Sequence, residues 1–376
     1  MSERLHSLEQ LLESDPANQH LFRECAALAT QQRDFGVLAR IADSRLKAVP
    51  GDALASSARA QALIGSREYR GAVGILEGLA KATPSDLSVQ QDLGLCHFCL
   101  GDYERAKASL DSVYRAGGRS SGLLRLLVST NHHLGLLSEA AAVADANSAP
   151  ALADPLLAGT YALLYLDKAQ PETAAKWAKA ALAVDPQCVD ALTVQGTLCM
   201  ASGETNGARA SFESVRALAP GTGRAWIGLG TIALLQQDFT RALGYLEPGV
   251  KLMPAHVGSW HVLAWAYLLS GDRTNAERAF QEALALNRNF AETHGGLAAV
   301  AALRGDGAAA QRALETALRL DPACLSAQFA RSVLAGQAGE GTKAREIVVT
   351  TFARLTADPA MRFAKTLVPR TPGKQG

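Results

Sequence analysis

One skeleton of residues returns every 34 residues along this chain, in fixed register. With Gln19 as position 1 of the first unit, nine units follow without insertion or deletion, and the last ends at Cys324. Position 20 is then alanine in eight of the nine units, and position 8 is a small residue in eight of the nine. A fixed period of this length predicts stacked repeats, each of which contacts only its neighbours.

The recurring positions describe a pair of short helices. Small side chains at positions 8 and 20 allow two helices to cross closely, and larger apolar groups at positions 4, 7, 11 and 24 fill the space beside the crossing. A Gly-Asp turn ends the first helix, because glycine adopts positive φ easily, and a proline at position 32 ends the second in six units. Helices of about a dozen residues are unstable alone in water, so the units must stack.

The skeleton is clearest in the eighth unit, from Val257 to Phe290, where it reads W-x2-L-(G/A)-x2-Y…G…A-x3-F-x2-A. This pattern resembles the tetratricopeptide repeat, whose period is also 34. The resemblance implies an all-α fold, a right-handed α–α superhelix (TPR solenoid) of nine to ten helix-turn-helix repeats. It also implies that positions 2, 5, 9, 12 and 13 of the first helices line a concave, peptide-binding face.

The chain is expected to divide into four parts. Residues 1–18 should form an N-terminal capping helix, and residues 19–324 the nine tandem units. Residues 325–366 should form a degenerate tenth unit with a C-terminal capping helix, and residues 367–376 a disordered tail. The fourth unit is irregular near residues 147–155. This predicts either a shortened helix that splits the array into two blocks or a longer loop that stacking tolerates.

Apolar or weakly polar side chains occupy the expected concave positions from the third to the eighth unit. A contiguous apolar strip on a solvent-facing surface usually marks a binding site, here one that suits a partner helix or an extended apolar peptide. The alternative is that neighbouring first helices bury these side chains against one another. The predicted groove residues are Leu95, Phe98, Cys99, His132, Leu163, Leu166, Thr197, Met200, Ile227, Leu234, His261, Trp265 and Leu268.

Two short motifs could carry chemistry, but neither is sufficient. Cys96 and Cys99 have a CxxC spacing, yet a zinc site needs four ligands and no second such pair exists. The adjacent residues His132 and His133 diverge by about 100° on a helix, so both cannot easily bind one ion. We therefore predict no catalytic residues, no cofactor and no metal, and we do not expect an enzyme. The Lys/Asn clamp with which some members of the family grip chaperone tails is also not expected, because position 9 holds no asparagine and position 5 no lysine.

The charge balance argues against a nucleic-acid-binding protein, since 37 Lys and Arg residues almost equal 36 Asp and Glu residues. Neither a signal-peptide pattern nor an apolar stretch of membrane-spanning length is expected. We expect a cytoplasmic, bacterial scaffold or adaptor that binds a protein or peptide, for example in secretion, envelope or pilus assembly, and that can self-associate. One alternative is a regulatory or substrate-recruiting subunit of a separately encoded enzyme, and a weaker one is single-stranded RNA binding.

Overall fold

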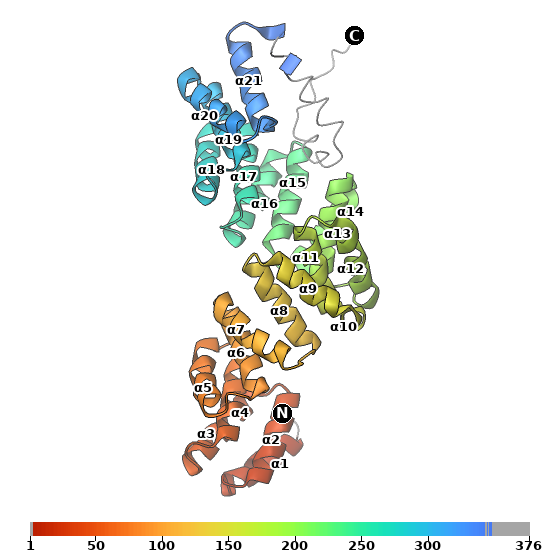
Figure 1. The fold of residues 1–376 in the computed structure, drawn as a ribbon, viewed down its shortest axis with the longest axis vertical. Helices are drawn as coiled ribbons and strands as arrows, with labels where there is room; N and C mark the ends of the chain where they lie inside the picture. Colours follow the sequence, from red (N-terminus) through yellow and green to blue (C-terminus); the bar gives the residue numbers. More distant parts are fainter. Residues whose placement is uncertain (1–2, 343, 345, 348–376) are drawn as a thin grey trace. The chain divides into compact units, whose positions relative to one another are not determined.

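The computed structural model describes residues 3–342, 344 and 346–347, and all regular elements in this part of the chain are α-helices (Figure 1). This confirms the all-α helical-repeat prediction. The chain forms two compact units, residues 1–170 and residues 171–376.

The first unit contains one leading helix followed by paired helices. Its helices are α1 (Glu3–Ser14), α2 (Gln19–Gln31), α3 (Phe35–Ala48), α4 (Ala53–Gly65), α5 (Tyr69–Ala82), α6 (Leu87–Cys99), α7 (Tyr103–Arg115), α8 (Ser121–His133), α9 (Leu137–Ala146), α10 (Ser148–Ala153) and α11 (Pro155–Asp167).

The second unit continues the same pairing. Its helices are α12 (Pro171–Val184), α13 (Val189–Ser202), α14 (Thr205–Leu218), α15 (Gly223–Leu235), α16 (Phe239–Leu252), α17 (Val257–Leu269), α18 (Arg273–Leu286), α19 (Ala291–Arg304), α20 (Gly307–Leu320) and α21 (Leu325–Gln337). No helix among the described residues combines the length and the apolar character that a membrane crossing requires.

The turn inside each repeat has one backbone conformation. Position 15 has a φ between 56° and 92° in all nine units and again at Gly339. Glycine holds this position in most repeats, but Arg33, Arg67, Ala169 and Gln237 adopt the same left-handed conformation. In five repeats an aspartate at position 16, such as Asp102, then caps the second helix by accepting a bond from its first turn.

The core of each repeat lies where its two helices cross. Every residue at position 20 is completely buried, including Leu38 in the first repeat. The small residue at position 8 lies under the large side chain at position 24. A Cβ atom on Gly94 would come within 2.6 Å of Leu110, and one on Gly196 within 2.8 Å of Phe212. Glycine at position 8 therefore makes room for the position-24 side chain of the same repeat.

The fourth repeat is the irregular one. Its second helix stops at Ala146, and the short α10 follows after Asn147. The division between the two compact units falls after Gln170, later than the predicted region of residues 147–155. The reason is that α11 packs against α8 and α9, so the first helix of the fifth repeat belongs to the N-terminal unit.

The structure describes the N-terminal end of the array more completely than the C-terminal end. Helix α1 packs on α2 and α3, with Leu5 and Leu12 buried. Helix α21 packs on α19 and α20 as the first helix of a tenth repeat. Beyond residue 342, the remainder of the predicted tenth unit, its capping helix and the tail of residues 367–376 lie outside the described residues, apart from residues 344, 346 and 347.

Candidate functional site

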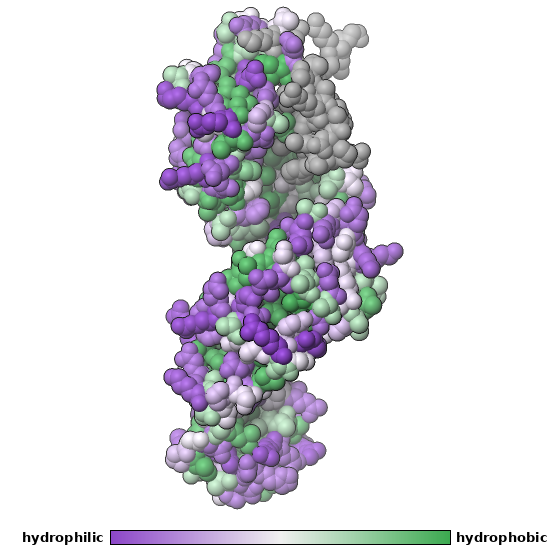
Figure 2. Space-filling view, viewed as in Figure 1, coloured by the Kyte–Doolittle hydropathy of each residue, from purple (hydrophilic) through white to green (hydrophobic). Residues whose placement is uncertain are grey.

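Three neighbouring first helices of the N-terminal unit, α6, α8 and α11, carry six of the predicted groove residues. Helix α8 packs against both α6 and α11. Leu95 and Phe98 on α6 are partly buried, as are Leu163 and Leu166 on α11, and Cys99 is exposed. We call the surface formed by Leu95, Phe98, Leu163 and Leu166 the concave apolar face. Figure 2 shows hydrophobic residues interspersed with hydrophilic ones around α8 on the side in view.

The two adjacent histidines of α8 have partners inside the unit. The Nε2 atom of His132 lies 2.8 Å from Oδ2 of Asp167 on α11, which ties the fourth repeat to the fifth. The His133 ring stacks on Tyr103, with ring centroids 4.5 Å apart, and Phe98 meets both rings edge-on. Burial, followed by the charge of His132, lowers the pKa of His133. Both histidines therefore join helices of the unit, and His132 presents less free hydrogen-bonding capacity to a partner than the sequence suggested.

The carboxylate of Asp92 lies beside the concave apolar face. Asp92 on α6 is one turn before Leu95 and is only partly exposed. Burial, followed by the charge of Asp86, raises the pKa of Asp92 to about 6. No ion pair or hydrogen bond of the Asp92 side chain occurs within the described residues. A cationic group brought here would favour the ionised form of this carboxyl.

In the C-terminal unit the predicted groove is closed at three positions. Leu234 is 3% exposed, Trp265 8% and Leu268 6%, and all three belong to one apolar core. The prediction that they line an open groove was wrong. Helices α19 and α21 approach closely because Gly295 lies against the Ala327 backbone, where a Cβ atom would come within 2.5 Å. The Trp265 ring consequently meets Phe329 of α21, with centroids 5.4 Å apart.

The remaining predicted residues of the C-terminal unit are partly buried. The Thr197 hydroxyl donates to the backbone oxygen of Thr193, and Met200 packs on the core around Phe212. Ile227 lies against Gly249 of α16. His261 accepts a hydrogen bond from Trp265 at 3.1 Å. These side chains therefore pack within their own unit.

The CxxC pair does not form a metal site in the described structure. Cys96 is buried, and burial raises its pKa to about 12, so the thiolate that binds metals is disfavoured at neutral pH. Within the described residues, no group of three or more His, Cys, Asp or Glu side chains has the geometry to hold a metal ion.

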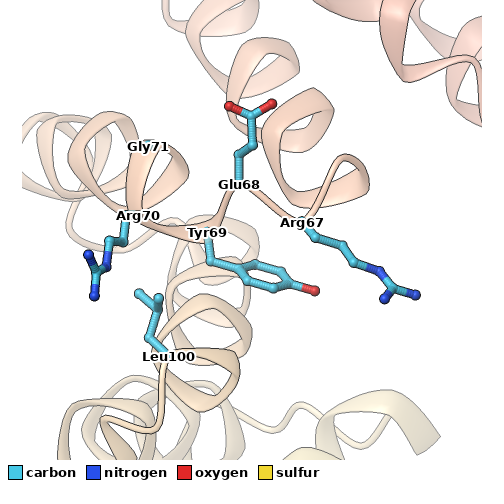
Figure 3. Close-up of a pocket in the computed structure, with 6 residues that line it drawn as sticks. All are labelled: Arg67, Glu68, Tyr69, Arg70, Gly71 and Leu100. Atoms are coloured by element: carbon cyan, nitrogen blue, oxygen red, sulfur yellow. The ribbon is translucent and has the colours of Figure 1, made fainter.

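The sequence reasoning overlooked a depression of about 370 Å³ at the turn of the second repeat. Its lining comes from the turn between α4 and α5, the first residues of α5, and the residue after α6. The lining residues are Arg67, Glu68, Tyr69, Arg70, Gly71 and Leu100 (Figure 3). We call it the turn pocket. The sequence contains one indication of this pocket, because Arg67 occupies a position where most repeats have glycine.

Comparison with known proteins gives family matches along the chain. One model of the tetratricopeptide repeat family matches residues 57–116, 162–221, 193–247 and 304–355, and a second matches residues 257–290. Together these ranges cover more than half of the chain. No curated protein matches the sequence.

Several solved structures are similar to this chain. A tetratricopeptide repeat protein from Parabacteroides merdae is 16% identical, with a TM-score of 0.43 over 66% of this chain and 97% of that one. A thermophilic TPR protein in Thermus thermophilus is 23% identical, with a TM-score of 0.39 over 48% and 97%. MamA from Desulfovibrio magneticus is 22% identical, with a TM-score of 0.38 over 45% and 96%.

Proposed function

Since this chain belongs to the tetratricopeptide repeat family, we propose that it is a non-catalytic scaffold that binds an apolar segment of a partner protein. The proposed binding surface is the concave apolar face of α6, α8 and α11. The partner segment is a helix with one apolar side or an extended apolar peptide. The proposed site therefore covers fewer repeats than the apolar strip that the sequence predicts. Some of the side chains in that strip are buried.

One observation carries the proposal. Leu95 and Phe98 on α6 and Leu163 and Leu166 on α11 remain partly exposed on two helices that both pack against α8. Their counterparts Leu234 and Leu268 in the C-terminal unit are in the core. Leaving large apolar groups in contact with water is unfavourable, by about 25 cal/mol for each Å² that a partner could cover. A partner segment would remove this surface from water.

The unpaired carboxyl of Asp92 adds a chemical preference. It lies on α6 next to the apolar side chains and has a raised pKa. A lysine or arginine of the partner would stabilise its ionised form. We therefore propose that the bound segment combines apolar side chains with a basic residue. A bacterial, cytoplasmic role in secretion, envelope or pilus assembly remains a proposal that rests on composition and the family alone.

The test is capture of partners by the full-length chain from extracts of its native host, with bound proteins identified by mass spectrometry. The double variant Leu163→Gln/Leu166→Gln removes the apolar groups of α11 while keeping residues that favour helices. We expect at least one partner to be retained about tenfold less by this variant than by the wild type, since two leucine contacts are lost.

The matched control is Leu11→Gln, which changes a leucine that is 57% exposed on α1, away from the concave apolar face. It should retain the partner as the wild type does, and melting curves must show that all three proteins are folded. If every captured protein binds the double variant as well as the wild type, the concave apolar face is not the binding site. The partner's identity distinguishes an adaptor from a subunit that recruits substrates to an enzyme.

A further inference from the structure

The turn pocket contains two arginines without acidic partners. Arg67 and Arg70 are exposed, and neither forms an ion pair or a side-chain hydrogen bond within the described residues. Figure 3 shows their guanidinium groups directed to opposite sides of the Tyr69 ring, while the Glu68 carboxylate points away from that ring. The pocket therefore carries positive charge at two edges that its own acidic residue does not neutralise.

The floor of the turn pocket is apolar. The Tyr69 ring and the Leu100 side chain lie next to each other there (Figure 3). Leu100 is 40% exposed, so a large aliphatic group faces solvent between the two arginines. The Cys99 thiol, followed by burial, raises the pKa of Tyr69, and the ring packs against the core that includes Leu93 of α6. Such a floor suits an aromatic or aliphatic side chain.

The first turn of α5 also favours an anion at this place. Helix α5 has no side-chain cap, because Glu68 stands where several other repeats have a capping aspartate. Its first N–H groups therefore lack a side-chain acceptor. Tyr69, Arg70 and Gly71 belong to this turn and line the pocket. A ligand carboxylate here would meet both the helix dipole and Arg70, which belongs to this turn.

The backbone of Arg67 gives an independent indication. Its φ is 64°, a conformation that costs a non-glycine residue energy and that glycine adopts freely. Glycine has the same position in the third repeat, at Gly101, with a φ of 78°. The fold alone would favour glycine at residue 67, so the arginine side chain has no evident structural use in the repeat.

We propose that the turn pocket binds an acidic peptide segment, with an aromatic or aliphatic side chain on Tyr69 and Leu100 and the carboxylates that flank it held by Arg67 on one side and Arg70 on the other. A peptide fits better than a free small molecule, because five of the six lining residues are exposed and only one side chain can be seated. The site is separate from the concave apolar face. The chain would then hold two partner segments of different chemistry, one apolar with a basic residue and one acidic.

The probe is a short fluorescein-labelled peptide in which glutamate and phenylalanine alternate, and its binding to the full-length chain is followed by fluorescence anisotropy. We expect Arg67→Gly to weaken binding about tenfold, since it removes a charge-assisted hydrogen bond. This variant should fold at least as well as the wild type, because glycine relieves the positive φ. The loss is thus separable from unfolding, which melting curves verify.

The matched control is Arg33→Gly, which makes the same change of charge and backbone strain at position 15 of the first repeat, outside the turn pocket. It should bind the probe within about twofold of the wild type. The Leu163→Gln/Leu166→Gln variant should also bind normally, so a failure here is distinguishable from a failure of the concave apolar face. Equal losses for Arg33→Gly and Arg67→Gly, or no loss for either, overturn the proposal.

A second pair of measurements separates the acidic and apolar contributions. A peptide with glutamine at every glutamate should bind at least about tenfold more weakly, because the arginines then lack an anion. A peptide with alanine in place of phenylalanine should bind the wild type more weakly than the original peptide does. The two peptides should bind the Leu100→Gln variant about equally, because the apolar floor of its pocket is reduced. Equal binding of the acidic and neutral peptides contradicts the assignment.

Discussion

His261 is a partly buried histidine whose environment disfavours its charged form. Its Nε2 atom accepts a hydrogen bond from Trp265, and its Nδ1 atom is buried without a hydrogen-bond partner among the described residues. The rings of Phe280 and Phe290 lie 5.5 and 5.6 Å from the imidazole. Burial lowers the pKa of His261 from 6.5 to about 4, although the nearby Glu292 carboxylate acts in the opposite direction.

The depressed pKa of His261 predicts that acid destabilises the protein. The unfolded chain binds the imidazole proton below about pH 6.5, whereas the folded protein binds it only below about pH 4. Stability should therefore fall as the pH decreases through this window, by roughly 3 kcal/mol in total. Thermal or urea unfolding of wild type and His261→Gln between pH 7 and pH 4 measures the effect, and the variant should lose less stability.

Comparing the wild type with His261→Gln separates the effect of His261 on stability from the effects of the other titrating groups. Asp92, for example, has a raised pKa and contributes with the opposite sign in this range, because its neutral form is favoured in the folded state. The substitution His20→Gln, at an exposed histidine, controls for the loss of an imidazole as such. If the stability of wild type and of His261→Gln changes with pH in the same way, the imidazole has the same pKa in the folded and the unfolded protein. The prediction then fails.

At the scale of helices, the close contact between α19 and α21 determines how accessible the neighbouring face of the repeats is to solvent. A Cβ atom on Gly295 would come within 2.5 Å of the Ala327 nitrogen and 2.7 Å of the Ser326 side chain. Because the first neighbour is backbone, the two helices must separate to accept it. We expect Gly295→Ala to lower the free energy of unfolding by about 1–3 kcal/mol, measured by urea unfolding.

Another glycine of the same unit provides the control. Gly244 lies in the interior of α16, and a Cβ atom added to it would meet nothing within 4 Å. Gly244→Ala should therefore raise the free energy of unfolding by about 0.5–1 kcal/mol through helix propensity. If both alanines stabilise the protein, the α19–α21 contact is looser than described, and Trp265 and Leu268 should then become more accessible to solvent.

The helices themselves were predictable from the sequence, whereas the accessibility of the groove was not. Position-20 residues such as Ala242 are buried wherever the period places them, because they mark a crossing within one repeat. Trp265 depends instead on the distance between successive repeats, which Gly295 helps to set from a different helix. Nothing in the residues around Trp265 specifies that distance. The partners of His132 were equally hidden, since Asp167 lies in the next repeat.

At the scale of the whole chain, several apolar cores each lie within one of the two units. One core joins α1 to α4 around Phe22 and Leu38, and the next two lie within α4 to α9. In the C-terminal unit, separate cores surround Phe212 and Phe280. The stability of a stacked-repeat protein is approximately the sum of terms from each repeat and from its interfaces with its neighbours. Each unit therefore contains apolar cores and repeat interfaces of its own.

This arrangement predicts that residues 1–170 fold as a separate polypeptide. The fragment keeps the α1 end helix and ends after α11, which packs on α8 and α9. Its far-ultraviolet circular dichroism should be helical and its thermal unfolding cooperative, although its melting temperature should be lower because fewer interfaces remain. A fragment ending at residue 146 loses α10 and α11 and should be less stable still. If residues 1–170 are unfolded, or no more stable than residues 1–146, the N-terminal unit depends on the rest of the chain. The two proposed binding sites would then require the whole array.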